Sequence, residues 1–312
     1  MTDYVADKIN AQLRRAIEAV LSDGMTQTAL AKQAGLSAPV VSQWLKDAYR
    51  GDNASVQAKL SAWLASRQDD AAVVAASGPR WVDTPTSQAI GRALTFARSK
   101  PAIAAVYGGA GVGKTTAMRR YAQTFPNVWI VTASPAVSSM AAMLREIGAA
   151  LELHGSGWQN RALSRDLKRR LMGTQGLLVI DEAQHLGVQA LEEIRAIHDA
   201  AQIGLVLSGN ESVYARLSGG SRRADFAQLF SRVGRKLKIG MPSTDDVNAI
   251  LSAWGVSGAK EREYAHQIAS MPGGLRGLVN TLGEAALAAL GLSQPVDVRM
   301  LRMAWGELGG AS

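Results

Sequence analysis

The chain has 312 residues, of which 47% are hydrophobic, so it is long enough for two or three modest domains with separate cores. It has no cysteine, which excludes disulfides and thiolate metal sites, and it has neither a signal-peptide core nor a membrane-length apolar stretch, so we expect a cytoplasmic protein without membrane contact. The net charge of +8 favours a polyanionic partner, most simply nucleic acid.

Residues 1–66 are predicted to form a small helical domain. Apolar residues recur at helical spacing over residues 7–22, and residues 26–46 predict a helix, a turn at Gly35 and a second helix. Those are the parts of a helix-turn-helix. The candidate DNA contacts on its second helix are Ser42, Gln43 and Lys46. They are few, and their apolar neighbours would also suit a protein-binding role.

Residues 67–85, rich in Ala, Ser, Gly, Pro and Asp, are predicted to be a linker. Strand and helix patterns then alternate over residues 86–241, which predicts an α/β core with a parallel sheet covered by helices on both faces. Residues 242–312 are predicted to be mostly helical. The predicted strands are Ala102–Tyr107, Val128–Ala133, Gly176–Asp181, Gly204–Ser208 and Lys236–Ile239, and the predicted helices span residues 116–124, 138–151, 161–172, 188–201 and 223–231.

A glycine-rich segment follows the first of these strands and has the pattern G-x-x-x-x-G-K-[ST] of a phosphate-binding P-loop. Glycines allow the backbone N–H groups to point at an anion, and the following helix N-terminus adds donors and a favourable dipole. Lys114 is expected to neutralise the β- and γ-phosphates. A glycine turn without a ligand is the alternative, which the flanking strand and helix disfavour. The candidate nucleotide-binding residues are Gly108, Gly109, Ala110, Gly111, Val112, Gly113, Lys114, Thr115, Thr116 and Asp181.

Polar side chains also follow two later strands. Asp181 and Glu182 end the apolar run 177–180, at the edge of a parallel sheet where ligands bind. Thr115 and Asp181 are the expected ligands of Mg²⁺, directly or through water, and Glu182 is expected to polarise the attacking water. Asn210, at the end of the next strand, is expected beside the γ-phosphate; an asparagine that only closes a turn is the alternative.

Two arginines are candidates for charge stabilisation. Arg232 precedes the last strand and could reach the γ-phosphate of a neighbouring subunit, a role worth roughly 10³ to 10⁵ in rate. Arg222, Arg223 and Arg235 compete for that role. Arg276 follows a glycine turn and could contact the γ-phosphate from a helical lid. For each of them the alternative is a solvated surface arginine.

A basic helix is predicted just before the strand that ends in Asp181. Its charged residues recur at spacings of three and four and therefore share one face, while its leucines form another. In a ring or filament the basic face could meet DNA phosphates; a solvated helix face is the alternative. The candidate DNA contacts are Arg161, Arg165, Lys168 and Arg169.

Taken together, these motifs resemble those of the AAA+ ATPases. The resemblance implies a P-loop NTPase core with a parallel sheet in the order 5-1-4-3-2, a C-terminal helical lid, and Mg²⁺-dependent hydrolysis of ATP to ADP and phosphate. It also implies the roles of Glu182, Asn210, Arg232 and Arg276 as catalytic residues.

The order of segments along nearly the whole chain is similar to that of the phage Mu B-like transposition proteins. This resemblance implies a lambda-repressor-like N-terminal domain and largely sequence-nonspecific, ATP-dependent binding of double-stranded DNA. It further implies a homo-oligomeric helical filament on target DNA, activation of a DDE transposase of the Mu transposase A type, release on hydrolysis, and a bacterial host cytoplasm. Gln184 departs from the acidic residue expected at its position, but Asp181 and Glu182 remain.

Two other functions stay open at this point. An ATP-switched transcription regulator would depend on residues 1–66 for DNA binding, whereas a transposition ATPase would keep substantial DNA binding in its core. A helicase loader or a secretion-type AAA+ ATPase would share the core motifs. The secretion type would need a membrane segment or a peptidoglycan module, and neither is visible in the sequence.

Overall fold

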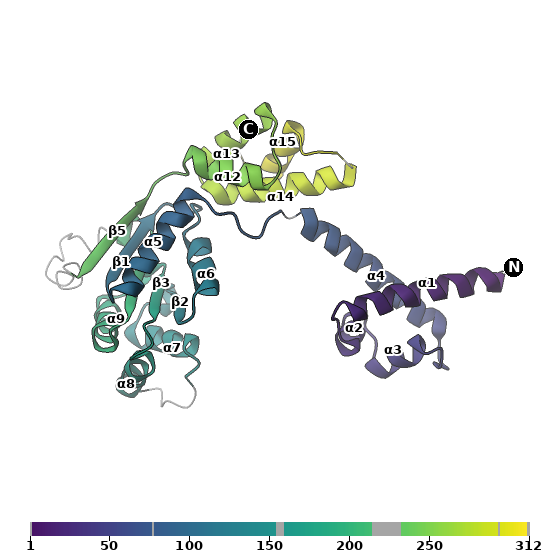
Figure 1. Cartoon of the computed structure of the whole chain (residues 1–312), viewed down its shortest axis with the longest axis horizontal. Helices are drawn as coiled ribbons and strands as arrows, with labels where there is room; N and C mark the ends of the chain where they lie inside the picture. Colours follow the sequence, from purple (N-terminus) through teal and green to yellow (C-terminus); the bar gives the residue numbers. More distant parts are fainter. Residues whose placement is uncertain (1, 77, 154–158, 214–231, 293, 311–312) are drawn as a thin grey trace. The chain divides into compact units, whose positions relative to one another are not determined.

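The computed structural model divides into two compact units, Met1–Ser77 and Gly78–Ser312 (Figure 1). It describes residues 2–76, 78–153, 159–213, 232–292 and 294–310. The helix predicted over residues 223–231 and the candidates Arg222 and Arg223 lie outside these ranges. Within them, no helix is both long enough and apolar enough to span a bilayer.

The first unit is helical, as the sequence predicts. Buried side chains from all its helices, among them Ile17, Trp44 and Leu60, form its core. The Thr26 hydroxyl caps the second helix by accepting from the Ala29 N–H, and Gly35 turns the chain at φ 65° before the third. The helices are α1 (Thr2–Ser22), α2 (Gln27–Gln33), α3 (Ala38–Leu45) and α4 (Asn53–Ala76).

The extent of α4 corrects the predicted linker. The helix continues to Ala76, so residues 67–76 are helical, whereas the sequence predicted a linker from residue 67. Alanine suits a helix better than any other residue, and this stretch is alanine-rich and free of Gly and Pro. The bend-prone residues, Gly78 and Pro79, come only after the helix has ended.

The second unit contains a parallel sheet in the order β2-β3-β4-β1-β5. From the other edge this is the predicted order 5-1-4-3-2, so that prediction is confirmed. The last strand begins three positions earlier than predicted, because Val233 already pairs with Ile103. The strands are β1 (Ile103–Gly108), β2 (Val128–Thr132), β3 (Leu177–Asp181), β4 (Gly204–Gly209) and β5 (Val233–Ile239).

Helices cover both faces of this sheet (Figure 1). Strand residues alternate between the two layers: Leu205 and Leu207 pack against α7, α8 and α9, while Val206 packs against α5 and α6. The sequence did not predict α5, although Thr84 and Ser87 form a capping box around Pro85 at its start. The helices are α5 (Pro85–Ser99), α6 (Lys114–Thr124), α7 (Met140–Ala150), α8 (Asn160–Leu171) and α9 (Val188–Ala201).

The C-terminal helices form a bundle, which confirms the predicted helical lid region. Its core is apolar, with Leu251, Leu278 and Leu301 fully covered. The helices are α12 (Thr244–Ala253), α13 (Ala259–Ser270), α14 (Gly274–Leu292) and α15 (Val298–Glu307).

A buried carboxylate ties the lid to the sheet layer. Asp246 in α12 is fully buried and accepts hydrogen bonds from the Thr86 N–H (2.8 Å) and the Thr86 hydroxyl (2.7 Å) at the start of α5. The Ser243 N–H (3.0 Å) and hydroxyl (2.8 Å) complete its shell. Burial alone would raise the pKa of Asp246, but these hydrogen bonds outweigh burial and hold the pKa below its ordinary value.

Replacing Asp246 by Asn is expected to lower the free energy of unfolding at pH 7 by about 2–3 kcal/mol, because hydrogen bonds to charged groups contribute about 1.5–3 kcal/mol. Since the folded pKa is depressed, this stabilisation is present above the unfolded value of 3.8 and is lost as the pH falls through the folded value. Urea unfolding from pH 7 to pH 3 measures the difference, which should narrow in acid. Asp245→Asn, at the exposed neighbouring position, should cost less than about 1 kcal/mol.

Candidate nucleotide-binding site

The glycine-rich segment forms the predicted strand–loop–helix unit. All residues of β1 are buried, and α6 begins at Lys114. Gly113, at the N-cap of α6, has φ 89° and Gly111 has φ 77°, in the left-handed region that side chains disfavour. Gly108 is required for space, since a Cβ there would lie 2.1 Å from the Ile239 carbonyl oxygen. The loop therefore exposes the start of α6 as an anion site.

Lys114 lies inside this loop with its side chain almost covered. Its Nζ donates to the carbonyl oxygens of Gly108 (2.9 Å) and Gly109 (2.6 Å). Burial lowers the pKa of Lys114, and the nearby Arg276 lowers it further, while Asp181 and Glu182 act in the opposite direction. A bound phosphate would bring a negative charge next to this desolvated ammonium group and so stabilise its charged form.

Thr115 and Asp181 meet, as the sequence predicted for a magnesium site. The Thr115 hydroxyl donates to Asp181 Oδ2 at 2.7 Å, and Asp181 is 1% exposed. Hydroxyl and carboxylate oxygens are the donors Mg²⁺ prefers, and Mg²⁺ usually keeps several water or phosphate ligands besides. Among the described residues, no group of three or more His, Cys, Asp or Glu side chains is arranged to hold a metal ion by itself. The pair thus fits a Mg²⁺ ion that the nucleotide would help to hold.

Glu182 and Asn210 are linked through Gln184. The Gln184 amide donates to Glu182 Oε2, and its Oε1 accepts from the Asn210 N–H at 3.3 Å. A carboxylate at position 184 would repel Glu182 across this short contact. Gln184, which replaces the expected acidic residue, therefore links the ends of β3 and β4 through hydrogen bonds.

The side chain of Asn210 closes a local turn. Its Oδ1 accepts from the Ser212 N–H (2.9 Å) and the Ser212 hydroxyl (2.6 Å), which is the turn role considered as the alternative from the sequence. The residue still lies at the carboxyl end of β4, one strand from Asp181. Its contact with a γ-phosphate stays a prediction.

The lid contacts the P-loop through backbone atoms. The Arg276 N–H donates to the Gly111 carbonyl at 3.1 Å, and a Cβ on Gly111 would lie 1.9 Å from the Gly273 carbonyl oxygen. Only glycine permits this approach. Arg276 lines the same cavity as Lys114, and its contact with a γ-phosphate stays a prediction.

That cavity, of about 380 Å³, has both polar and apolar lining residues. The polar ones include Lys114, Glu182 and Arg276. Trp81 and Trp254 belong to the apolar lining, which the sequence did not predict as functional. The available signal was a tryptophan inside a segment otherwise rich in Gly, Pro and Asp. The arrangement suits a ligand with a phosphate tail and a flat apolar base. Its further apolar lining includes Pro79, Val82, Ile250, Leu275 and Val279.

Arg232 lies away from this cavity. It directly precedes Val233, which pairs with the first residue of β1, whereas the P-loop follows the last residue of β1. The Arg232 guanidinium donates to Asp199 in α9. Arg232 therefore lies at the amino ends of the strands, whereas its own P-loop lies at their carboxyl ends. An arginine that serves a neighbouring subunit requires such a separation.

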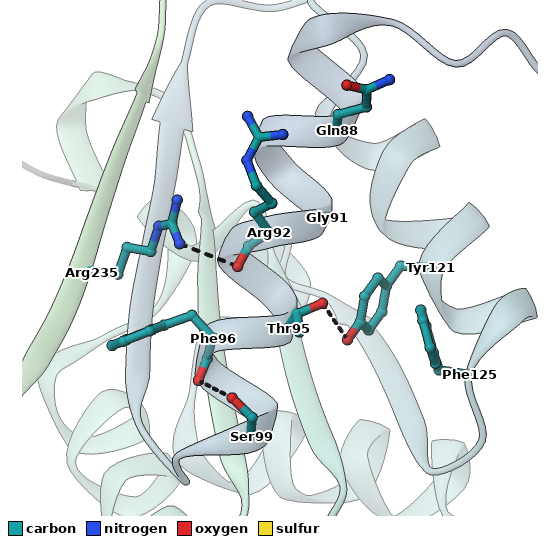
Figure 2. A pocket seen from close by; sticks show the side chains of 9 residues that line it. All are labelled: Gln88, Gly91, Arg92, Thr95, Phe96, Ser99, Tyr121, Phe125 and Arg235. Carbon is teal, nitrogen blue, oxygen red and sulfur yellow. Dashed lines mark hydrogen bonds between the residues drawn. The ribbon is translucent and has the colours of Figure 1, made fainter.

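The competing Arg235 occupies a different place (Figure 2). It lines a shallow depression of about 660 Å³ over α5, where its guanidinium donates to the Arg92 carbonyl at 3.3 Å. Phe96 and Phe125 also line this depression. Arg235 is thus held against the outer surface of α5.

The predicted basic face of α8 is present. Leu163, Leu167 and Leu171 are buried, while Arg161, Arg165 and Arg169 are exposed. Acidic residues reduce the positive charge of this face. Lys168 Nζ lies 3.1 Å from Glu193 Oε1, and the guanidinium groups of Arg165 and Arg169 lie 3.8 and 3.6 Å from Asp166 Oδ1. In the first unit, Gln43 and Lys46 are exposed and Ser42 is half-buried. DNA contact by either set stays a prediction.

Comparisons with known proteins agree with these features. A family model of AAA domains matches residues 97–217, and a model for the C-terminal part of the Mu B transposition protein matches residues 231–308. The chain is 41% identical over 300 residues to the ATP-dependent target DNA activator B of Escherichia phage Mu, covering 96% of this chain and 95% of that one. It is 41% identical over 264 residues to the Mu-like prophage FluMu DNA transposition protein B of Haemophilus influenzae, covering 84% and 92%.

Solved structures share the fold at low identity. The ORC2 protein of Aeropyrum pernix aligns with a TM-score of 0.55 at 16% identity, covering 71% of this chain and 67% of that one. A Walker-type ATPase of Pyrococcus abyssi aligns with a TM-score of 0.54 at 14% identity, covering 70% and 71%. These likenesses support the AAA+ fold with its helical lid.

Replacing Gly111 by Ala is expected to lower the free energy of unfolding by more than about 2 kcal/mol, because it combines a disfavoured φ with a backbone clash. The displaced lid should also weaken ATP binding at least about tenfold. Thermal unfolding and fluorescent-nucleotide titration measure both effects. Gly109→Ala is the matched control for stability, since its Cβ would meet nothing within 4 Å, and equal destabilisation by both variants would contradict the explanation.

Proposed function

The chain belongs to the Mu B transposition protein family, and we propose that it is an ATP-dependent target DNA activator in DNA transposition. The observation that carries the proposal is the joint presence of a complete P-loop site and near-full-length similarity to proteins of that name. An operator-specific regulator or a helicase loader is not favoured by any of these relatives.

The chain is an AAA+ ATPase in this proposal, and the cavity between sheet and lid takes ATP. The P-loop amides and Lys114 would hold the phosphates, and Thr115 with Asp181 would hold Mg²⁺, which supplies charge neutralisation on the phosphate oxygens. Glu182 is positioned by Gln184 at the same end of the cavity to orient a water. Trp81 and Trp254 would enclose the base. Hydrolysis would yield ADP and phosphate.

Hydrolysis in this scheme needs a second copy of the chain. Because Arg232 lies at the strand ends opposite the P-loop, it would serve the nucleotide of a neighbouring copy. ATP held between adjacent copies would then favour their association, since it would contact both. Repetition of one such head-to-tail contact gives a ring or an open helical filament, and we propose a filament on double-stranded DNA.

DNA binding is assigned mainly to the second unit. The exposed arginines of α8 form the basic face that would meet phosphates, and such contacts carry no base specificity. The first unit, with Gln43 exposed on α3 and Lys46 exposed directly after this helix, is proposed as a helix-turn-helix that adds DNA contacts. The captured duplex would be delivered to a DDE transposase, with hydrolysis driving release, in the cytoplasm of a bacterial host.

Lys114→Ala is expected to abolish ATP-dependent assembly on duplex DNA, because the phosphates lose their main charge partner. Sedimentation or electron microscopy with DNA and ATP would show filaments for the wild type and none for the variant, and the ATPase rate of the wild type should rise when duplex is added. A variant that assembled on DNA like the wild type would contradict the proposed function.

Arg165→Ala and Arg169→Ala are each expected to lower the slope of log affinity against log salt by about 0.9, the value for one lost phosphate contact. Lys168→Ala should change the slope less, because Glu193 already pairs with its ammonium group. Fluorescence anisotropy with a nonspecific duplex, in ATP and at several salt concentrations, measures the slopes. Arg299→Ala, at an exposed site in the lid, is the control. An equal decrease of the slope for this variant would contradict the assignment of α8 as the DNA-binding face.

A further inference from the structure

A row of charges along α9 ends at Arg232. Glu192, Arg195 and Asp199 follow one another at spacings of three and four residues and so share one face of the helix. Arg195 Nε donates to Glu192 Oε2 at 2.9 Å, and Arg195 NH1 donates to Asp199 Oδ2 at 2.7 Å. The other oxygen of Asp199, Oδ1, accepts from Arg232. The row therefore connects a helix packed on the sheet to the arginine at the sheet edge.

The placement of Asp199 is unfavourable without its partners. A carboxylate in the last turn of a helix faces the negative end of the helix dipole. Two guanidinium groups share this one carboxylate, and Glu192 pairs with Arg195 at the other end of the row. Burial lowers the pKa of the neighbouring His198, whose Nδ1 donates to the Ile203 carbonyl at 2.6 Å. The imidazole is thus neutral at pH 7, and Asp199 is held by the arginines.

The contact with Asp199 leaves the Arg232 side chain accessible to a further ligand. Its side chain remains 49% exposed, and the bond from Nη1 to Asp199 uses one of the five N–H donors of the guanidinium group. Arg195, only 17% exposed, holds the carboxylate from the other side. An arginine fixed in this way reaches a phosphate with less loss of conformational freedom than a free surface arginine.

We propose that Asp199 is a positioning residue: it orients Arg232 toward the γ-phosphate of the nucleotide bound by the adjacent copy of the chain. This inference rests on the proposed function, because it requires ATP hydrolysis between subunits. Asp199 touches no nucleotide. Its effect appears only through Arg232, and only in the subunit next to the one that hydrolyses ATP.

The first test is a double-mutant cycle on the full-length protein in the presence of duplex DNA and ATP. Asp199→Asn should lower kcat about 10- to 100-fold, the effect of misplacing a catalytic group by about an ångström, with KM for ATP unchanged. Arg232→Ala should lower kcat further. The double variant should match Arg232→Ala, because Asp199 acts through that side chain. Asp245→Asn, which removes a carboxylate charge from the lid surface, is the control.

The second test distinguishes action on the neighbour from action within one subunit. Lys114→Ala retains an intact Arg232 but cannot use its own site, whereas Asp199→Asn retains an intact site. Mixing the two variants should restore ATPase activity, since some sites then combine an intact nucleotide pocket with a correctly held Arg232. If Asp199→Asn is poorly folded in a thermal melt, Asp199→Glu, which keeps the carboxylate, should recover activity.

Three results would overturn the inference: a wild-type kcat for Asp199→Asn, a double variant multiplicatively worse than Arg232→Ala, or no recovery in the mixture. Each of them leaves the proposed function intact as long as the wild type hydrolyses ATP on DNA. A wild type without ATPase activity on DNA would instead contradict the proposed function itself.

Discussion

The nucleotide site depends on one backbone contact, the approach of Gly111 in the P-loop to Gly273 and Arg276 at the start of α14. The Arg276 N–H donates to the Gly111 carbonyl at 3.1 Å, and no Cβ fits between Gly111 and the Gly273 oxygen. The contact joins the lid to the P-loop, and Gly111 and Arg276 both line the cavity. The Thr86–Asp246 hydrogen bonds also join the lid to the sheet layer, and of these two connections the Gly111 contact is the one that borders the cavity.

The parallel sheet separates the two halves of the proposed chemistry. The groups for binding and hydrolysis follow the carboxyl ends of β1, β3 and β4, while Arg232 lies at the amino end of β5. The strands are only five to seven residues long, but this length is enough to keep an arginine from reaching its own nucleotide. In the proposed function this separation would make hydrolysis conditional on assembly, because Arg232 would serve the nucleotide of a neighbouring copy.

The alternation of strands and helices, the P-loop and the Thr115–Asp181 pair could be predicted, because they follow from apolar runs, glycines and a short motif. The strand order was expected from the AAA+ resemblance. The tie between Thr86 and Asp246 joins residues 160 positions apart, and no local pattern marks it. The apolar lining by Trp81 and Trp254 escaped prediction for the same reason. The helical residues 67–76 were mistaken because alanine is common in both helices and linkers.

The two connections between lid and sheet layer differ in what they can sense. The Thr86–Asp246 connection is buried and self-contained, so a nucleotide would change it little. The Gly111–Arg276 connection borders the cavity, so a nucleotide would touch both of its sides. A ligand shifts an equilibrium only through contacts that differ between the two states. A nucleotide is therefore expected to act on the lid through the residues that line the cavity, Gly111 and Arg276 among them, rather than through the Thr86–Asp246 connection.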